Sequence, residues 1–185
     1  MRVIGGQFRS RRLKSIAGAL TRPTPDRLRE TLFDILTPQI VGATFLDAFA
    51  GTGAVGIEAL SRGAEHAWFL ERSRAALEVL KRNIRELALE SRATVVSGSA
   101  LLTLPRYGAE IVFLDPPYDQ EGAYQQALEV LQEAAPQLVI AQHSVRLELP
   151  AEVGVFGSTR TVRQGDNVLT FYGVQDDVNR GNVRV

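Results

Sequence analysis

Two short stretches contain residues whose types and spacing suit the binding and chemistry of a small molecule. The first is AGTGAVG, residues 50–56, a G-x-G-x-x-G pattern that follows Asp47. The second is FLDPPY, residues 113–118, where an acid is followed by two rigid prolines and an aromatic ring. Each stretch follows or completes a short apolar run, so each is predicted to lie at the carboxyl end of a β-strand.

The glycine turn by itself is compatible with two cofactors. A dinucleotide would place its pyrophosphate at the N-terminus of the helix that begins near Gly53. Asp47 opposes this reading, because a carboxylate facing the turn repels phosphate and attracts an ammonium group. S-adenosylmethionine has no phosphate and carries an ammonium and a sulfonium, and Gly51 and Gly53 let the backbone pass close to it. Glu71, after the next apolar run, is placed to accept both ribose hydroxyls of either cofactor. The glycine motif and Glu71 therefore do not decide between the two cofactors. A third explanation is that the glycines serve only close packing and bind no ligand.

The second stretch favours methyl transfer to an amine on a nucleic-acid base. Such an amine is a poor nucleophile, because its lone pair is delocalised into the ring. The Asp115 carboxylate and the Pro116 carbonyl are two acceptors that can hold both amine hydrogens and turn the lone pair out of the ring plane. Pro117 forces the preceding residue into an extended shape, which keeps that carbonyl directed at the substrate. Tyr118 can stack on a base drawn out of its helix or loop. This chemistry selects S-adenosylmethionine as the cofactor.

The elements that position these residues follow from the spacing of apolar and cap residues. Strands alternate with helices through most of the chain, and two alternating segments around RQGD close it without a helix between them. Strands are predicted at 43–49, 66–71, 93–97, 110–115 and 137–143, an antiparallel pair at 152–162 and 167–174, and helices at 25–36, 54–63, 73–87 and 124–134. Thr24 is the predicted cap of the first helix, with Pro25 at its first position, and Ser73 caps the third. Gly63 is predicted to end the second helix.

This pattern predicts an α/β fold: a doubly wound, Rossmann-like and mostly parallel sheet with an antiparallel C-terminal hairpin. Ligands of such sheets bind beyond the carboxyl ends of the strands. Asp47, the glycine turn, Glu71, Ser99 and FLDPPY are therefore expected along one rim. Residues 1–185 are predicted to form a single domain, with residues 1–22 as a basic hairpin extension within it.

Charge is unevenly distributed along a chain whose formal net charge is zero. Residues 1–24 carry six basic residues and no acidic one. These are Arg2, Arg9, Arg11, Arg12, Lys14 and Arg22. Such an arm is typical of contact with a polyanion, although charge alone also fits a mobile, solvated terminus. Apolar residues that alternate with the arginines favour an ordered hairpin.

Composition excludes several classes of site. Cysteine is absent and only His66 and His143 are present, so disulfides and thiolate metal sites are excluded and no metal is predicted. There is no apolar run of the roughly 20 residues that span a membrane and no secretory signal. A cytoplasmic protein without a membrane partner is expected. His143 is predicted to be a hydrogen-bonded structural residue, with a role at the rim as the alternative.

Four stretches, in order, resemble the RsmD family of small-subunit ribosomal RNA guanine-N2 methyltransferases. They are MRVIGGQFRSRRL, TRPTPDRLRETLFDIL, LDAFAGTGAVGIEALSRGA and FLDPPY, and the likeness runs to about residue 174. The resemblance implies a class I S-adenosylmethionine-dependent methyltransferase with an RNA-binding N-terminal hairpin. It also implies methylation of the exocyclic N2 amine of a guanine in 16S rRNA, within the assembling or assembled 30S ribosomal subunit. A monomer is expected.

The resemblance also implies a role for each matching position. The methionine part of the cofactor would be contacted by Asp47, Gly51 and Gly53, and the ribose by Glu71. The catalytic residues would be Asp115, Pro116 and Tyr118, with Arg22 and Thr24 beside the catalytic pocket. RNA phosphates would be bound by Arg9, Arg11 and Arg12. Similar methyltransferases often have an aspartate after the third strand that accepts the adenine amino group. In this sequence Ser99 occupies that position. Its hydroxyl can accept the hydrogen bond from the adenine amino group without the charge of a carboxylate, or the Ala100 amide contacts the adenine instead.

Rival functions remain open on the sequence. A methyltransferase acting on adenine N6 of DNA or RNA would use the same motif, but no stretch is free to form a sizeable target-recognition region. A protein-glutamine methyltransferase is disfavoured by the basic arm. A non-catalytic RNA-binding module is disfavoured by the intact Asp-Pro-Pro-Tyr motif. An NAD-dependent enzyme is disfavoured by Asp47 and by the lack of an evident acid or base for hydride transfer.

Overall fold

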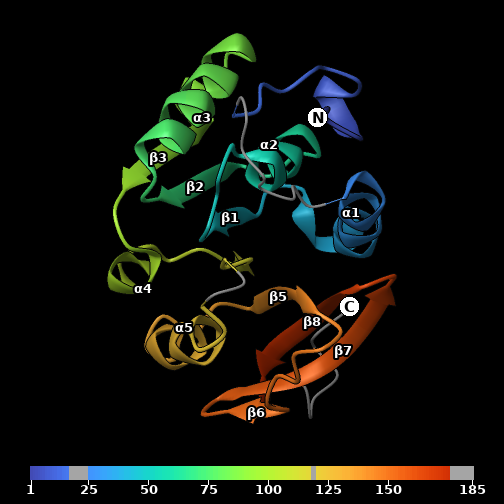
Figure 1. The fold of residues 1–185 in the computed structure, drawn as a ribbon, viewed down its shortest axis with the longest axis vertical. Helices are drawn as coiled ribbons and strands as arrows, with labels where there is room; N and C mark the ends of the chain where they lie inside the picture. The colour runs from blue at the N-terminus through green and yellow to red at the C-terminus, as the bar shows by residue number, and fades with distance from the viewer. Residues whose placement is uncertain (17–24, 118–119, 176–185) are drawn as a thin grey trace.

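The strands form a single twisted sheet with helices on both faces (Figure 1). The computed structural model describes residues 1–16, 25–117 and 120–175. Its strands are β1 (Thr44–Asp47), β2 (His66–Glu71), β3 (Ala93–Ser97), β4 (Ile111–Leu114), β5 (Leu138–Ser144), β6 (Glu152–Val153), β7 (Phe156–Gln164) and β8 (Asn167–Val174). Its α-helices are α1 (Asp26–Ile40), α2 (Ala54–Ser61), α3 (Arg74–Glu86), α4 (Ala100–Thr103) and α5 (Ala123–Leu131). Short 3₁₀ turns cover η1 (Gly6–Phe8), η2 (Glu90–Arg92) and η3 (Leu104–Arg106).

The strand order is β3-β2-β1-β4-β5-β8-β7-β6. Strands β1 to β5 run parallel, and β8, β7 and β6 add an antiparallel edge. This confirms the predicted doubly wound sheet with its C-terminal hairpin. The chain reverses its direction of travel across the sheet between β1 and β4, where β1 lies between β2 and β4. Open α/β sheets bind ligands at such a switch point, beyond the carboxyl ends of the two strands.

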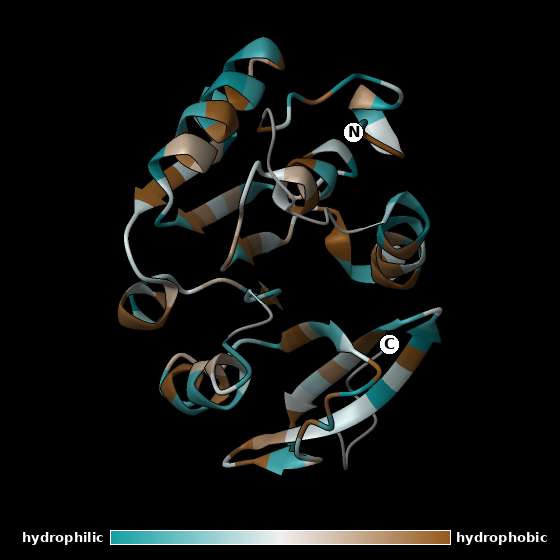
Figure 2. Cartoon of the chain, in the orientation of Figure 1, coloured by the Kyte–Doolittle hydropathy of each residue, from teal (hydrophilic) through white to brown (hydrophobic). Residues whose placement is uncertain are grey.

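Two hydrophobic clusters pack on opposite faces of the sheet, because successive side chains of a strand point to opposite sides. In β1, Phe45 belongs to the cluster beneath α1, α2 and α3, whereas Leu46 belongs to the cluster beneath α4 and α5. Figure 1 shows these two groups of helices on either side of the sheet. Figure 2 shows that α3 has hydrophobic and hydrophilic sides, as expected for a helix on a sheet. Within the described ranges, no helix combines the length and apolar composition that a membrane crossing requires.

The observed N-terminal cap of α3 is the residue predicted from the sequence, whereas that of α1 is not. The Ser73 hydroxyl accepts a hydrogen bond from the Ala76 N–H at 3.4 Å, as predicted for the cap of α3. In α1, Pro25 is the cap residue rather than the first helical residue, and Thr24 lies outside the described residues. The helix also runs past the predicted end at residue 36, through Pro38 to Ile40. Ile40 is buried in the core, and this burial compensates for the hydrogen bond that Pro38 cannot donate.

Residues 1–13 fold back on themselves as a short hairpin, within the basic hairpin extension predicted for residues 1–22. Arg2 and Arg12 form an antiparallel bridge, and η1 lies at the tip. The Val3 N–H donates to the Arg11 carbonyl and the Leu13 N–H donates to the Met1 carbonyl, each at 3.0 Å. Residues 17–24 lie outside the described ranges. A buried carboxylate on α2 attaches this hairpin to the core. Glu58 accepts hydrogen bonds from the Ile4 and Gly5 N–H groups, each at 2.7 Å, so these donors bind a side chain and not a second strand.

Buried polar side chains attach this segment to the core. Glu58 is fully buried and forms ion pairs with Arg62 at 3.0 Å and with the buried Arg29 at 3.8 Å. Arg29 also donates to the Arg2 carbonyl at 2.6 Å, and the Ser61 hydroxyl donates to the Gly5 carbonyl at 2.6 Å. Buried charges are stable only when paired and hydrogen-bonded. The N-terminal segment supplies backbone partners to this network and is thereby attached to α1 and α2.

Candidate active site

A cavity of about 530 Å³ opens at the carboxyl ends of β1, β2 and β4. Its volume is in the range of small-molecule sites, which is roughly 300–1,000 Å³. The cavity brings together most of the catalytic and cofactor-binding residues predicted from the sequence. Asp47, Gly51, Glu71, Ser99, Ala100, Asp115 and Pro116 all line it. Met1 and Ile16 also line it, so the N-terminal segment forms part of its wall.

Asp47 ends β1 at the base of the cavity, with 2% of its surface exposed. One carboxylate oxygen accepts a hydrogen bond from the Gly56 N–H of α2 at 3.0 Å. Burial raises the pKa of Asp47 to about 7; the Gly56 N–H opposes that shift, and the Asp115 and Glu71 carboxylates add to it. Three acidic side chains around one cavity repel an anion and attract a cation. The local charge therefore suits an ammonium or sulfonium and opposes a pyrophosphate.

The three glycines of the turn have different functions. Gly51 has φ +53°, and no described atom lies within 4 Å of the place where a Cβ would sit. A Cβ on Gly53 would lie 2.3 Å from the Leu80 side chain of α3, and one on Gly56 would lie 2.3 Å from the Phe69 ring of β2. Gly53 and Gly56 thus allow helices and strand to pack closely. Of the three, Gly51 lines the cavity, and the contact of Gly53 with the cofactor stays a prediction.

Glu71 joins the glycine turn to the start of α3. One of its carboxylate oxygens accepts from the Gly51 N–H at 2.7 Å, and the other accepts from the Arg72 and Ser73 N–H groups at 2.8 and 2.7 Å. A carboxylate has about four acceptor positions, so these three bonds leave about one for a ligand. The prediction that Glu71 accepts both ribose hydroxyls therefore requires that one oxygen be shared or that one backbone bond be exchanged.

The Asp-Pro-Pro motif follows β4 and lies on the cavity wall. Phe113 pairs with Asp47 of β1 on one side and with Ile140 of β5 on the other, so the motif leaves the sheet beside Asp47. Pro116 is buried and Pro117 is exposed, and both line the cavity with Asp115. Tyr118 lies outside the described residues. On the opposite wall, Ser99 is the cap residue of α4 and is exposed, while Ala100 is buried.

Similarity to known proteins covers nearly the whole chain. Residues 1–173 match the family described as "Conserved hypothetical protein 95". The chain is 37% identical over 182 residues to the putative rRNA methyltransferase YlbH of Bacillus subtilis, covering 93% of this chain and 98% of the relative. It is 43% identical over 135 residues to Ribosomal RNA small subunit methyltransferase D of Escherichia coli, covering 72% and 67%.

The chain belongs to the RsmD family.

A solved structure agrees with this assignment. The putative methyltransferase yhhF from Escherichia coli superposes with a TM-score of 0.82 at 34% identity, covering 94% of this chain and 97% of that one. The sheet is therefore that of the class I methyltransferase fold, as the sequence predicted.

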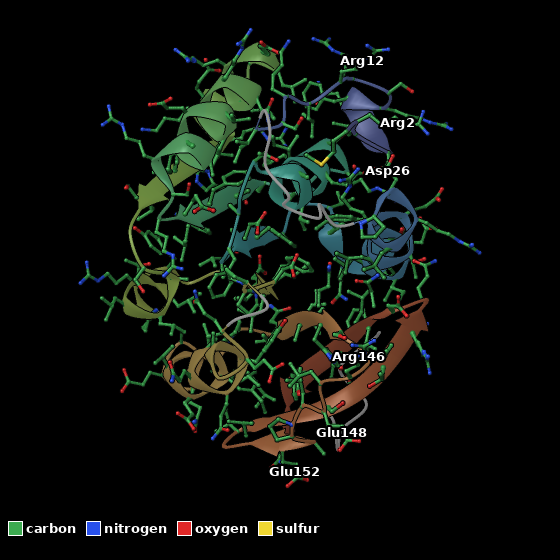
Figure 3. All side chains as sticks on the ribbon, in the orientation of Figure 1. Arg2, Arg12, Asp26, Arg146, Glu148 and Glu152 are labelled. Carbon is green, nitrogen blue, oxygen red and sulfur yellow. The ribbon has the colours of Figure 1, made fainter. Side chains whose placement is uncertain are left out.

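The predicted RNA-binding arginines of this RsmD-family chain lie on its surface. Arg9, Arg11 and Arg12 are exposed, and Arg11 donates to the Glu86 carbonyl at 3.4 Å. Figure 3 shows Arg12 and Arg2 on the N-terminal segment in the upper part of the view, and Arg146 in the lower half beside the C-terminal strands. Arg22 and Thr24, predicted to lie beside the catalytic pocket, are outside the described residues.

Two polar residues near the cavity were missed in the sequence. Asn83 of α3 is buried; its amide oxygen accepts from the Lys14 N–H at 2.8 Å, and its amide nitrogen donates to the Lys14 and Thr52 carbonyls at 3.2 and 2.9 Å. It thus connects the basic segment to the glycine turn. Gln142 lies in β5, is 4% exposed, and lines the cavity. For Gln142 the available signal was a polar residue directly after the apolar run LVIA of β5.

His143 is a structural residue, as predicted. Its ring nitrogens lie 2.8 Å from the Thr170 hydroxyl and 3.0 Å from the Ser144 carbonyl oxygen. Burial lowers its pKa. The ring is not part of the cavity wall.

Proposed function

We propose that this chain transfers a methyl group from S-adenosylmethionine to the exocyclic N2 amine of a guanine in 16S rRNA of the 30S ribosomal subunit. The observation that carries the proposal is the meeting of Asp47 and the Asp115-Pro116 corner in one cavity at the switch point of the sheet. Membership of a family whose relatives are named rRNA methyltransferases supports the same reaction. We infer action as a monomer in the cytoplasm, where this RNA is found.

The residues present fit S-adenosylmethionine. Asp47 offers a buried carboxylate for the ammonium, Gly51 lets the ligand approach the backbone, and Ser99 with Ala100 faces the position expected for adenine. When bound, this cofactor supplies an electrophilic methyl group on a positively charged sulfur. The carboxylates that favour this cation repel the pyrophosphate of NAD.

The chain's own contribution to catalysis is to position the amine. The Asp115 carboxylate and the Pro116 carbonyl accept the two amine hydrogens, which directs the nitrogen lone pair into the cavity. The nitrogen becomes acidic once it is methylated, so Asp115 or water can take the released proton without a strong base. Fixing the reacting atoms in this way accelerates the reaction by orientation. Tyr118, from its place in the motif, is proposed to stack on the base.

Nucleoside mass spectrometry tests this function. Small subunits and naked 16S rRNA from a strain lacking the gene are incubated with the protein and S-adenosylmethionine and then digested. We expect N2-methylguanosine to appear at one position, and comparison of the two substrates shows whether the ribonucleoprotein is required. Formation of N6-methyladenosine instead would assign the adenine alternative, and an unmodified digest of both substrates would favour a non-catalytic RNA-binding module.

The raised pKa of Asp47 predicts a pH-dependent affinity for the cofactor. An acid with a raised pKa is charged only above that value, so the attraction for the ammonium is lost as the pH falls through about 7. We expect the affinity for S-adenosylmethionine, measured by calorimetry, to fall roughly tenfold between about pH 8 and about pH 6. Asp47→Asn is expected to bind weakly with a flat profile.

Two comparisons control the pH experiment. Asp166→Asn changes an exposed acid in the β7–β8 turn and should keep the wild-type profile. NAD is titrated in parallel and should give no binding heat. A wild-type affinity that does not change with pH would contradict the role of Asp47, and binding of NAD alone would reject the cofactor.

A further inference from the structure

Gln142 has an unsatisfied polar atom beside the proposed catalytic corner. Its side chain lies on the cavity wall, and its amide oxygen is buried with no hydrogen-bond partner among the described residues. The backbone around it is fixed, because the Tyr124 hydroxyl donates to the Gln142 carbonyl at 2.6 Å. Buried acceptors in folded proteins are usually satisfied, so an exception in a ligand cavity indicates a donor that arrives with the ligand.

The register of the sheet places Gln142 next to Asp115. Leu114 of β4 pairs with Ala141 of β5, and the same register continued by one residue brings Asp115 opposite Gln142. Neighbouring strands are about 4.7–4.9 Å apart, and laterally paired residues of parallel strands share a face. Side chains two residues apart in a strand point to the same face of the sheet, so Gln142 shares a face with Leu138 and Ile140. Both of these pack in the hydrophobic cluster on the same side of the sheet as Asp47. Gln142 is therefore on the face where the amine is proposed to be held.

Bases that carry an exocyclic amine differ in the ring atom beside that amine. Adenine has the N1 lone pair beside its N6 amine, and cytosine has the N3 lone pair beside its N4 amine. Guanine alone has a ring N–H, at N1, beside its N2 amine. An oxygen acceptor next to the two amine acceptors therefore attracts guanine and repels the lone pairs of the other two bases.

We propose that Gln142 selects guanine by accepting a hydrogen bond from its N1–H through the side-chain amide oxygen. This rests on the proposed function and deepens it, since the Asp115-Pro116 corner serves an amine of any base. In this arrangement Asp115 and Pro116 hold the amine, and Gln142 reads the adjacent ring position. Gln142 is thus a specificity residue, and Asp115 remains the catalytic one.

The test compares guanine with 2,6-diaminopurine at the methylated position. This analogue keeps the 2-amine but has a lone pair at N1 in place of the N–H. Once the position is mapped, RNAs carrying either base are made by ligation, and kcat/KM for methyl transfer is measured. We expect the wild type to prefer guanine by roughly 10- to 100-fold. Gln142→Leu, which removes the acceptor at similar size, should bring this ratio close to one.

Matched variants separate selection from structure. Gln142→Glu retains an acceptor and should keep the preference for guanine. Gln164→Leu is the control, because Gln164 also has a buried amide oxygen without a partner among the described residues but lies in β7, away from the cavity; it should keep the wild-type ratio. Calorimetry should show unchanged S-adenosylmethionine binding in all three variants.

The possible failures are distinguishable. A wild type that methylates neither RNA would refute the proposed function and this inference with it. A wild type that methylates guanine and the analogue equally, or prefers the analogue, would overturn the role of Gln142 alone, and this result needs no variant that folds. An unchanged ratio in Gln142→Leu would do the same.

Discussion

Asp115→Ala is expected to lower the rate of methyl transfer to rRNA by about 10²- to 10³-fold or more while leaving S-adenosylmethionine affinity within a few-fold. The reason is geometric. Asp115 lies on the cavity wall beside Pro116, where their two oxygens are proposed to hold the amine hydrogens. Without the carboxylate, the lone pair stays in the ring plane and the nitrogen remains a poor nucleophile. Single-turnover transfer of a labelled methyl group measures the rate, and calorimetry measures cofactor binding.

Two further variants make this experiment specific. Asp115→Asn keeps an oxygen acceptor without the charge, so its rate should lie between those of the wild type and Asp115→Ala. Asp166→Ala removes an exposed acid at the β7–β8 turn and should retain wild-type activity. Turnover by Asp115→Ala at the wild-type rate would remove Asp115 from the catalytic set, and an equal loss of cofactor binding would reassign it to the cofactor.

Changing Arg9, Arg11 and Arg12 together to glutamine is expected to weaken rRNA binding by about 10²-fold at physiological salt. The three side chains are exposed on a segment anchored to the core by Glu58 and Asn83. For every RNA phosphate that is no longer neutralised, the slope of log affinity against log salt should flatten by about 0.7–0.9. Filter binding over a range of salt concentrations measures both quantities.

A charge-matched variant distinguishes a local effect from one of net charge. Three other arginines are also exposed: Arg146, Arg160 and Arg163. Figure 3 shows Arg146 in the lower half of the view, away from Arg12 at the top. Changing these three to glutamine alters the net charge equally but should leave the salt slope near the wild-type value. If the N-terminal variant has the wild-type slope, or if the slope flattens equally in both variants, the N-terminal segment is not the RNA-binding surface.

The N-terminal segment is attached to the glycine turn and forms part of the cavity wall. Asn83 holds the Lys14 backbone on one side and the Thr52 carbonyl of the glycine turn on the other. Met1 and Ile16 line the cavity. RNA held by the segment's arginines would therefore be delivered at the wall of the cavity where the methyl group is expected.

Local sequence determined most of the elements and their order. The strand predicted at 152–162 is instead two strands, β6 and β7, and helix α4 was not predicted. The strand at 66–71 and the Ser73 cap were predicted as they are observed, because apolar runs and cap hydrogen bonds depend on residues close together in the chain. Strand ends carrying Asp47, Glu71 and Asp115 could be assigned to one rim, because parallel strands align their carboxyl ends. The family resemblance added the reaction, since the Asp-Pro-Pro-Tyr motif serves amines of several bases.

Only the tertiary structure decided which atoms meet. Leu80 of α3 fills the space where a side chain on Gly53 would lie, and the oxygens of Glu71 are largely occupied by backbone N–H groups. Glu58 binds the N–H of Ile4, and Gln142 faces the cavity beside Asp115. Such interactions join residues far apart in sequence through strand register and helix packing, and those are set by burial over the whole core rather than by any local pattern.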